Sequence, residues 1–183
     1  GALKLMGKEA HIVVDRTKNL AVNLIEAVET QAEQGLFVTP AAALQNVSDN
    51  DLLIIVDIHN KDFIESRELY EKCKQVIIID HHRKTVNYID NAVIFYHEPY
   101  ASSASEMVTE LIQYFRFSGD EKIPSYCAEA LLSGIMLDTK SFVMRTGART
   151  FEAAAFLKKL GADTVAVKLL FSSSFDSYKH KSE

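Results

Sequence analysis

The chain has 183 residues, with 20 basic and 25 acidic side chains and a formal charge of −5. Its hydrophobic fraction of 48% and charged fraction of 25% are typical of a folded domain and argue against intrinsic disorder. No apolar run approaches the roughly 20 residues of a membrane span, and two cysteines make no disulfide framework. The acidic balance argues against a stable DNA or RNA partner, and a reduced, cytoplasmic setting is expected.

Short β-branched runs alternate with longer helical segments along the chain. In chain order, strands are expected over 10–15, 36–38, 52–57, 75–80 and 92–96. Helices are expected over 20–34, 40–45, 102–115, 124–137, 149–160, and from 163 or 164 toward 171. This order predicts an α/β fold, with a mainly parallel sheet flanked by helices.

Acidic and histidine side chains stand where three of these apolar elements end. Asp57 ends the strand LLIIVD, Asp80-His81-His82 follow the strand VIII, and Asp138 ends the helical stretch ALLSGIMLD. Because ligands collect beyond the carboxyl ends of parallel strands, the two strand-end groups are expected to share one crevice. Carboxylates and imidazoles without a nearby thiolate suit Mn²⁺, Fe²⁺ or Zn²⁺.

A simpler interpretation stays open for some of these residues. A lone aspartate is more often a cap or turn residue, and this applies to both Asp57 and Asp138. A histidine pair directly after Asp80 is different, because capping needs no imidazole. His59 and His97 are expected to be structural rather than ligands.

Two further segments are candidates for binding phosphate. Ser102 and Ser103 stand at an expected helix start, where free backbone N–H groups can hold an anion. The alternative is a plain capping box between Ser103 and the glutamate three residues on. Arg145 and Thr146 follow the third acidic position, and an arginine fork suits phosphate oxygens. Arg149 is the weaker candidate of the two arginines, because one of them can instead pair with a surface carboxylate.

Four stretches resemble a known family nearly phrase by phrase: VDIHN, IDHHRK, EPYASSASEMVTELI and GIMLDTKSFVMRTGARTFEAAAFLKKLGADT. They resemble the DHH phosphoesterases, and most of all the membrane-anchored cyclic-di-AMP phosphodiesterases of Gram-positive bacteria. The match runs over about 7–170, which is nearly the whole chain. DHH alone is a weak tripeptide, whereas DHHR with LDTKSF and RTG is specific to this branch.

The resemblance implies a hydrolase that uses two Mn²⁺ ions to open cyclic di-AMP to linear pApA. By the family pattern, Asp57 bridges both ions, His81 binds one of them, and Asp138 completes the shell of that ion. His82 is then expected near the scissile phosphate, while Asp80 orients the histidine pair.

The family also has parts that this sequence does not match. It opens with a strand carrying a motif like HxxPDxDxxGA, and it continues into a second domain with a glycine-rich substrate loop. We therefore expect 1–162 to be a catalytic subdomain without its first strand and first metal motif, and 163–183 to begin a linker helix toward a substrate domain. The chain is expected to hold at most one Mn²⁺ and to be impaired in activity.

The resemblance further implies a cytoplasmic domain of a membrane-anchored parent, itself not bound to the membrane, and it allows a homodimer. Alternatives to cyclic di-AMP hydrolysis are a DHH hydrolase of short oligonucleotides or nucleotide phosphates and a non-catalytic nucleotide-binding fragment. Polyphosphate or pyrophosphate hydrolysis is more distant.

Overall fold

The computed structural model describes residues 1–17, 21–117 and 122–169. Within them the strands are β1 (Ile12–Val13), β2 (Phe37–Val38), β3 (Leu52–Val56), β4 (Gln75–Asp80) and β5 (Ile94–His97). The helices are α1 (Ala2–Leu5), α2 (Val22–Glu29), α3 (Pro40–Asn46), α4 (Arg67–Lys72), α5 (Ala104–Ile112), α6 (Ser125–Asp138) and α7 (Ala148–Lys159), with a 3₁₀ turn η1 (Lys61–Phe63).

The central sheet has the order β3-β4-β5 with all strands parallel. Its register pairs Val56 with Ile79 and Asp80 with His97, so the three strands end at one edge. The middle of strand β4, Val76–Ile79, is entirely apolar because both of its faces are covered. One face packs on α4 and the loop after β4, and the other packs on α5 through a cluster of Ile79, Ala101 and Met107.

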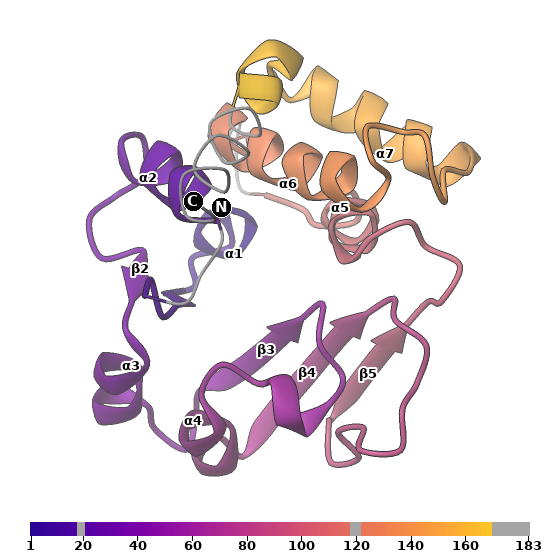
Figure 1. Ribbon diagram of the computed structural model, residues 1–183. Coiled ribbons are helices and arrows are strands. Elements are labelled where there is room, and N and C mark those ends of the chain that lie inside the picture. The colour runs from indigo at the N-terminus through magenta and orange to yellow at the C-terminus, as the bar shows by residue number, and fades with distance from the viewer. Residues whose placement is uncertain (18–20, 118–121, 170–183) are drawn as a thin grey trace, which may run out of the picture.

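Helices α5, α6 and α7 form a layer over this sheet (Figure 1). Helices α6 and α7 share a core that includes Ala128, Leu132 and Leu157, all fully or almost fully buried. Helices α5 and α6 approach closely because position 134 is a glycine. A Cβ atom added at Gly134 would lie 2.1 Å from Ser105 Oγ. The helical layer therefore holds the end of α6, where Asp138 stands, above the carboxyl edge of the sheet.

The expected α/β architecture with parallel strands and flanking helices is confirmed. The strands fall into two sheets, however, because β1 pairs with β2 apart from the other three. The expected helix over 20–34 is shorter, ending at Glu29, and α4 was not anticipated. Helical structure resumes at 164 and continues to 169, and the rest of the expected linker segment lies outside the described residues. None of the described helices has the length and apolar character needed to cross a membrane.

Candidate metal centre

Asp57 follows β3 in an unusual backbone conformation. Its φ of 68° lies in the left-handed region, which aspartate tolerates better than most residues. Its amide still donates to the carbonyl of Ile79 at 2.8 Å, so the sheet pairing continues through the turn. The carboxylate consequently lies against the end of β4, with Oδ1 3.3 Å from His81 Nε2.

The buried His81 ring has its two nitrogens in different surroundings. Nδ1 lies 3.2 Å from the carbonyl oxygen of Ala101, which can only accept, so Nδ1 carries a hydrogen. In the neutral ring the lone pair is then on Nε2, which lies 3.3 Å from Asp57 Oδ1 and 3.6 Å from Asp138 Oδ2. Three acceptors facing one another require a cation between them, either a proton or a metal ion. The donor set therefore fits a divalent metal.

The charges of the site agree with this requirement. The pKa of His81 is raised, chiefly because the Asp57 carboxylate hydrogen-bonds to its protonated form. Burial, and then the nearby Asp57 charge, raise the pKa of Asp138. The site thus binds protons more readily than isolated side chains do, as expected of acceptor atoms that favour a cation between them.

The second histidine of the pair is anchored separately. His82 is half exposed, and its Nδ1 lies 2.8 Å from Oδ1 of the fully buried Asp80. Burial alone would raise the pKa of Asp80, but hydrogen bonds from His82 and His59 outweigh it and lower that pKa. Ligand atoms of Asp57, His81 and His82 all lie within 4.8 Å of one another, so these three form a group that could hold a metal ion.

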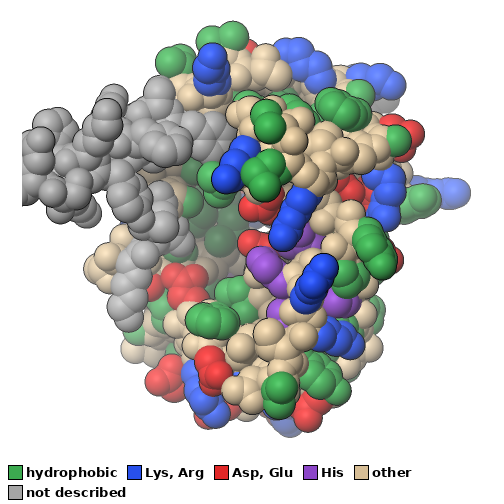
Figure 2. Space-filling model, turned by 45° about the vertical axis from the view of Figure 1, so that its right-hand side comes forward, with side chains coloured by type: hydrophobic (Ala, Val, Ile, Leu, Met, Phe, Trp, Pro, Cys, Tyr) green, Lys and Arg blue, Asp and Glu red, His purple; other side chains and the backbone are tan. Residues whose placement is uncertain are grey.

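A small hollow of about 120 Å³ opens beside the centre. Asp57 and Asp138 line it together with residues of β3, α5 and α6. In Figure 2 the histidines reach the surface among acidic side chains, with Lys and Arg side chains close by. This mixture of a negative pocket and a basic rim is suited to a cation below a phosphate.

The two serines predicted for phosphate binding are buried at the start of α5. Ser103 caps the helix, with its Oγ accepting from the amide of Glu106 at 3.0 Å. The hydroxyl and amide of Ser102 both donate to the buried carboxylate of Glu106. Both hydroxyls therefore have partners within the chain, as the capping alternative describes, and neither serine lines the hollow.

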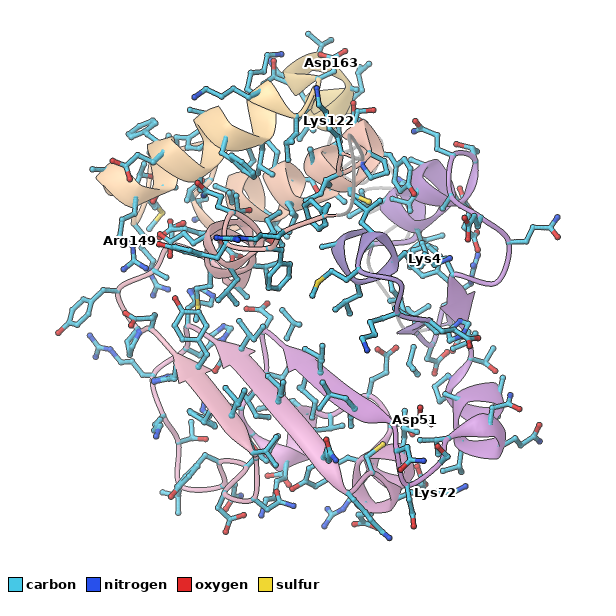
Figure 3. The ribbon with its side chains drawn as sticks, turned by 180° about the vertical axis from the view of Figure 1, so that it is seen from behind. Lys4, Asp51, Lys72, Lys122, Arg149 and Asp163 are labelled. Atoms are coloured by element: carbon cyan, nitrogen blue, oxygen red, sulfur yellow. The ribbon has the colours of Figure 1, made fainter. Side chains whose placement is uncertain are left out.

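The two arginines have different surroundings. Arg145 is exposed, has a φ of 51°, and its charge acts to lower the pKa of Asp138, so it lies on the basic rim of the site. Thr146 beside it donates to the carbonyl of Met144 at 3.0 Å. Arg149 (Figure 3) makes a two-bond fork to Glu110 at 2.8 and 2.7 Å, which joins α7 to α5. Arg149 is thus the arginine with a carboxylate partner.

His59 is the residue whose contacts the sequence did not predict. It is buried, and its Nδ1 hydrogen-bonds to Asp80 Oδ2. The signal in the sequence was the position of His59, two residues after the strand-end carboxylate of Asp57.

Known proteins share extensive sequence similarity with this chain. A family model described as "DHH family, N-terminal domain" matches residues 3–135. The chain is 41% identical over 146 residues to the cyclic-di-AMP phosphodiesterase PdeA of Listeria monocytogenes, covering 79% of this chain and 22% of the relative. It is 40% identical over 174 residues to the cyclic-di-AMP phosphodiesterase GdpP of Bacillus subtilis, covering 93% of this chain and 26% of the relative.

The chain therefore spans about a quarter of the length of these curated relatives. Among solved structures, an exopolyphosphatase-related protein from Bacteroides fragilis superposes with a TM-score of 0.64 at 18% identity, covering 92% of this chain and 58% of that one. This likeness supports the fold alone.

Proposed function

The chain belongs to the DHH family, and from this membership we propose that it is the catalytic part of a Mn²⁺-dependent phosphodiesterase that opens cyclic di-AMP to linear pApA. The observation that carries the proposal is the convergence of Asp57 and Asp138 on His81 Nε2. The substrate is inferred from the relatives named as cyclic-di-AMP phosphodiesterases.

Asp57, His81 and Asp138 would hold the cation, and the donor atoms of His82 also lie within reach. A bound divalent cation supplies positive charge that offsets the charge developing on phosphoryl oxygens, and it makes water more acidic. The chain itself contributes orientation: the carbonyl of Ala101 fixes the His81 ring so that its lone pair faces the carboxylates.

His82 and Arg145 are assigned to the phosphate. The Nδ1 hydrogen of His82 is engaged by Asp80, which leaves Nε2 of this half-exposed ring for a phosphate oxygen or a proton transfer. The exposed guanidinium of Arg145 can bind a second phosphate oxygen. Thr146, Ser102 and Ser103 are retained as weaker candidates for the same role, because each hydroxyl already has a partner in the chain.

The proposal also covers the domain organisation and the cellular location of the chain. Residues 1–162 form the catalytic subdomain and 163–183 begin a linker toward a substrate domain, in a cytoplasmic part of a membrane-anchored parent. A homodimer is compatible with this organisation.

The test is hydrolysis by the purified chain at micromolar concentration, with cyclic di-AMP and Mn²⁺, followed by chromatography of the products. The expected product is pApA, formed slowly, absent with EDTA and absent in Asp57→Asn. Release of AMP from pApA without opening of the cyclic compound would instead indicate a hydrolase of short oligonucleotides. A chain that binds Mn²⁺ but hydrolyses neither compound would contradict the proposed activity.

A further inference from the structure

His59 connects the buried Asp80 to the backbone of the loop that follows the histidine pair. Its Nε2 lies 3.1 Å from the amide nitrogen of Thr85, and a backbone N–H can only donate. Nε2 is therefore the acceptor, and the ring carries its hydrogen on Nδ1, from which it donates to Asp80 Oδ2. One imidazole thus satisfies two groups on different segments.

Asp80 divides its two oxygens between two histidines. Oδ2 accepts from His59, and Oδ1 accepts from Nδ1 of His82 at 2.8 Å. Because the Asp80 side chain is fully buried, an oxygen that lost its donor would have no water to replace it. The orientation of the Asp80 carboxylate, and through it the ring of His82, consequently depends on His59 together with the His82 backbone amide, which also donates to that carboxylate.

A second set of contacts holds the same loop from the side of β5. His97 Nε2 hydrogen-bonds to the carbonyl of His82, and the Lys84 ammonium lies 4.5 Å from the ring centre of Phe95. The loop carrying His82 is therefore clamped between His59 on one side and β5 on the other. His81 is held independently, by the carbonyl of Ala101.

We propose that His59 is a positioning residue: through Asp80 it fixes the tautomer and orientation of His82, and it does so without contributing to metal affinity. This inference rests on the proposed function for its consequence in catalysis, but not for the geometry it assigns. His81 is anchored by the Ala101 carbonyl, whereas His82 is anchored by Asp80, which in turn contacts His59. A change at His59 can therefore alter the orientation of His82 without altering the metal affinity of His81.

Three substitutions of His59 test its contact with Asp80 and its contact with Thr85 separately. His59→Asn keeps a donor near the position of Nδ1 and so retains the bond to Asp80. His59→Gln keeps an acceptor near the position of Nε2 and so retains the bond to Thr85. His59→Phe fills the space and keeps neither. His11→Phe is the matched control, because His11 is an exposed histidine whose partners are the Gly35 carbonyl and the Glu9 carboxylate.

The first readout is nitrogen-detected NMR of the metal-free chain at about pH 8.5, where an ordinary histidine is neutral. We expect His82 to be the Nδ1–H tautomer in the unaltered chain, in His11→Phe and in His59→Asn, and to become a mixture in His59→Phe and His59→Gln. The Thr85 amide should exchange faster in His59→Asn and His59→Phe than in His59→Gln. A His82 tautomer unchanged in His59→Phe would overturn the inference.

The second readout separates turnover from metal binding. In His59→Phe and His59→Gln, kcat for cyclic di-AMP should fall about ten- to a hundredfold, as for other residues that hydrogen-bond to a site residue and fix its orientation. Mn²⁺ affinity should change less than about threefold, because the separate His81 anchor is untouched. Equal losses of Mn²⁺ affinity and kcat would contradict the positioning role of His59. A kcat that falls across the variants only in proportion to the loss of melting temperature would contradict it as well. If the unaltered chain showed no turnover, the proposed function would fail, while the tautomer of His82 would still decide this inference.

Discussion

His81 Nε2 lies 3.3 Å from a carboxylate oxygen of Asp57 and 3.6 Å from one of Asp138, so a single lone pair faces two acceptors. Neither carboxylate comes from the strand that carries His81. The arrangement is therefore a property of the tertiary fold, and its natural complement is a divalent cation.

Removing a ligand at this point should remove the metal. Asp57→Ala or His81→Ala is expected to weaken Mn²⁺ binding by at least about a hundredfold and nearly to abolish hydrolysis, because each takes away a direct ligand. Electron paramagnetic resonance titration of free Mn²⁺ measures the binding. His11→Ala should bind like the unaltered chain, and only variants with unchanged melting curves are compared.

The number of bound ions is a separate prediction. The donors assigned here seat one cation, so we expect at most one Mn²⁺ per chain after dialysis. Elemental analysis measures the ratio. Two tightly held ions per chain would mean that ligands other than Asp57, His81 and Asp138 take part.

Metal affinity and metal-free stability should respond to pH in opposite directions. Because the pKa of His81 is raised, Mn²⁺ must displace a proton, and its affinity should rise between about pH 6 and 8. Without metal, the stability contributed by protonated His81 is complete below its ordinary pKa and is lost as pH rises through the raised value. The raised pKa of Asp138 acts in the same direction.

Titrations with Mn²⁺ and urea melts with EDTA at several pH values measure the two trends. Asp57→Asn is the informative variant, because it removes the main cause of the raised His81 pKa. In that variant the metal-free stability should lose most of its dependence on pH in this range. A dependence equal to that of the unaltered chain would contradict the assignment.

The two arginines provide a matched pair. Arg145→Gln should lower turnover about ten- to a hundredfold with an unchanged melting temperature, because a phosphate contact is lost at an exposed position. Arg149→Gln should instead destabilise the chain by about 0.5–1 kcal/mol, since it breaks a half-exposed ion pair with Glu110. The opposite pattern would exchange the roles of the two residues.

The contact between α5 and α6 predicts a stability effect away from the ligands. Gly134→Ala places a Cβ atom 2.1 Å from Ser105 Oγ, so the serine or the helix must move. We expect a loss of about 1–3 kcal/mol in urea melts, as for overpacked cores. Gly147→Ala is the control, because nothing lies within 4 Å of its added Cβ. A tolerated Gly134→Ala would mean that the two helices can separate without cost.

Much of the central fold could be predicted because its signals are local. The apolar runs at β3 and β4 are bounded by turn residues, and the structure has them at 52–56 and 75–80. Helix α4 has only six residues and little periodicity to detect. The division of strands into two sheets was out of reach, because pairing depends on contacts between distant segments that no local pattern specifies.

The site shows the same limit. Asp57 and the histidine pair could be predicted to lie close together, because each follows a strand and the carboxyl ends of parallel strands meet at one edge of the sheet. The partner of His59 could not be identified, since Asp80 lies 21 residues away and the bond forms only when β3 and β4 align. For Ser103 and Glu106 the spacing of three residues was itself the cap signal, and the structure makes that contact.

The centre draws its carboxylates from two separate layers: Asp57 directly follows β3 of the sheet, and Asp138 ends α6 in the helical layer. A site divided in this way acts as a removable crosslink as well as a place for chemistry. Its occupancy couples the layers, so the melting temperature should rise with the concentration of free cation. Whether the chain unfolds as one cooperative unit or in two steps then depends on the ionic composition of its surroundings.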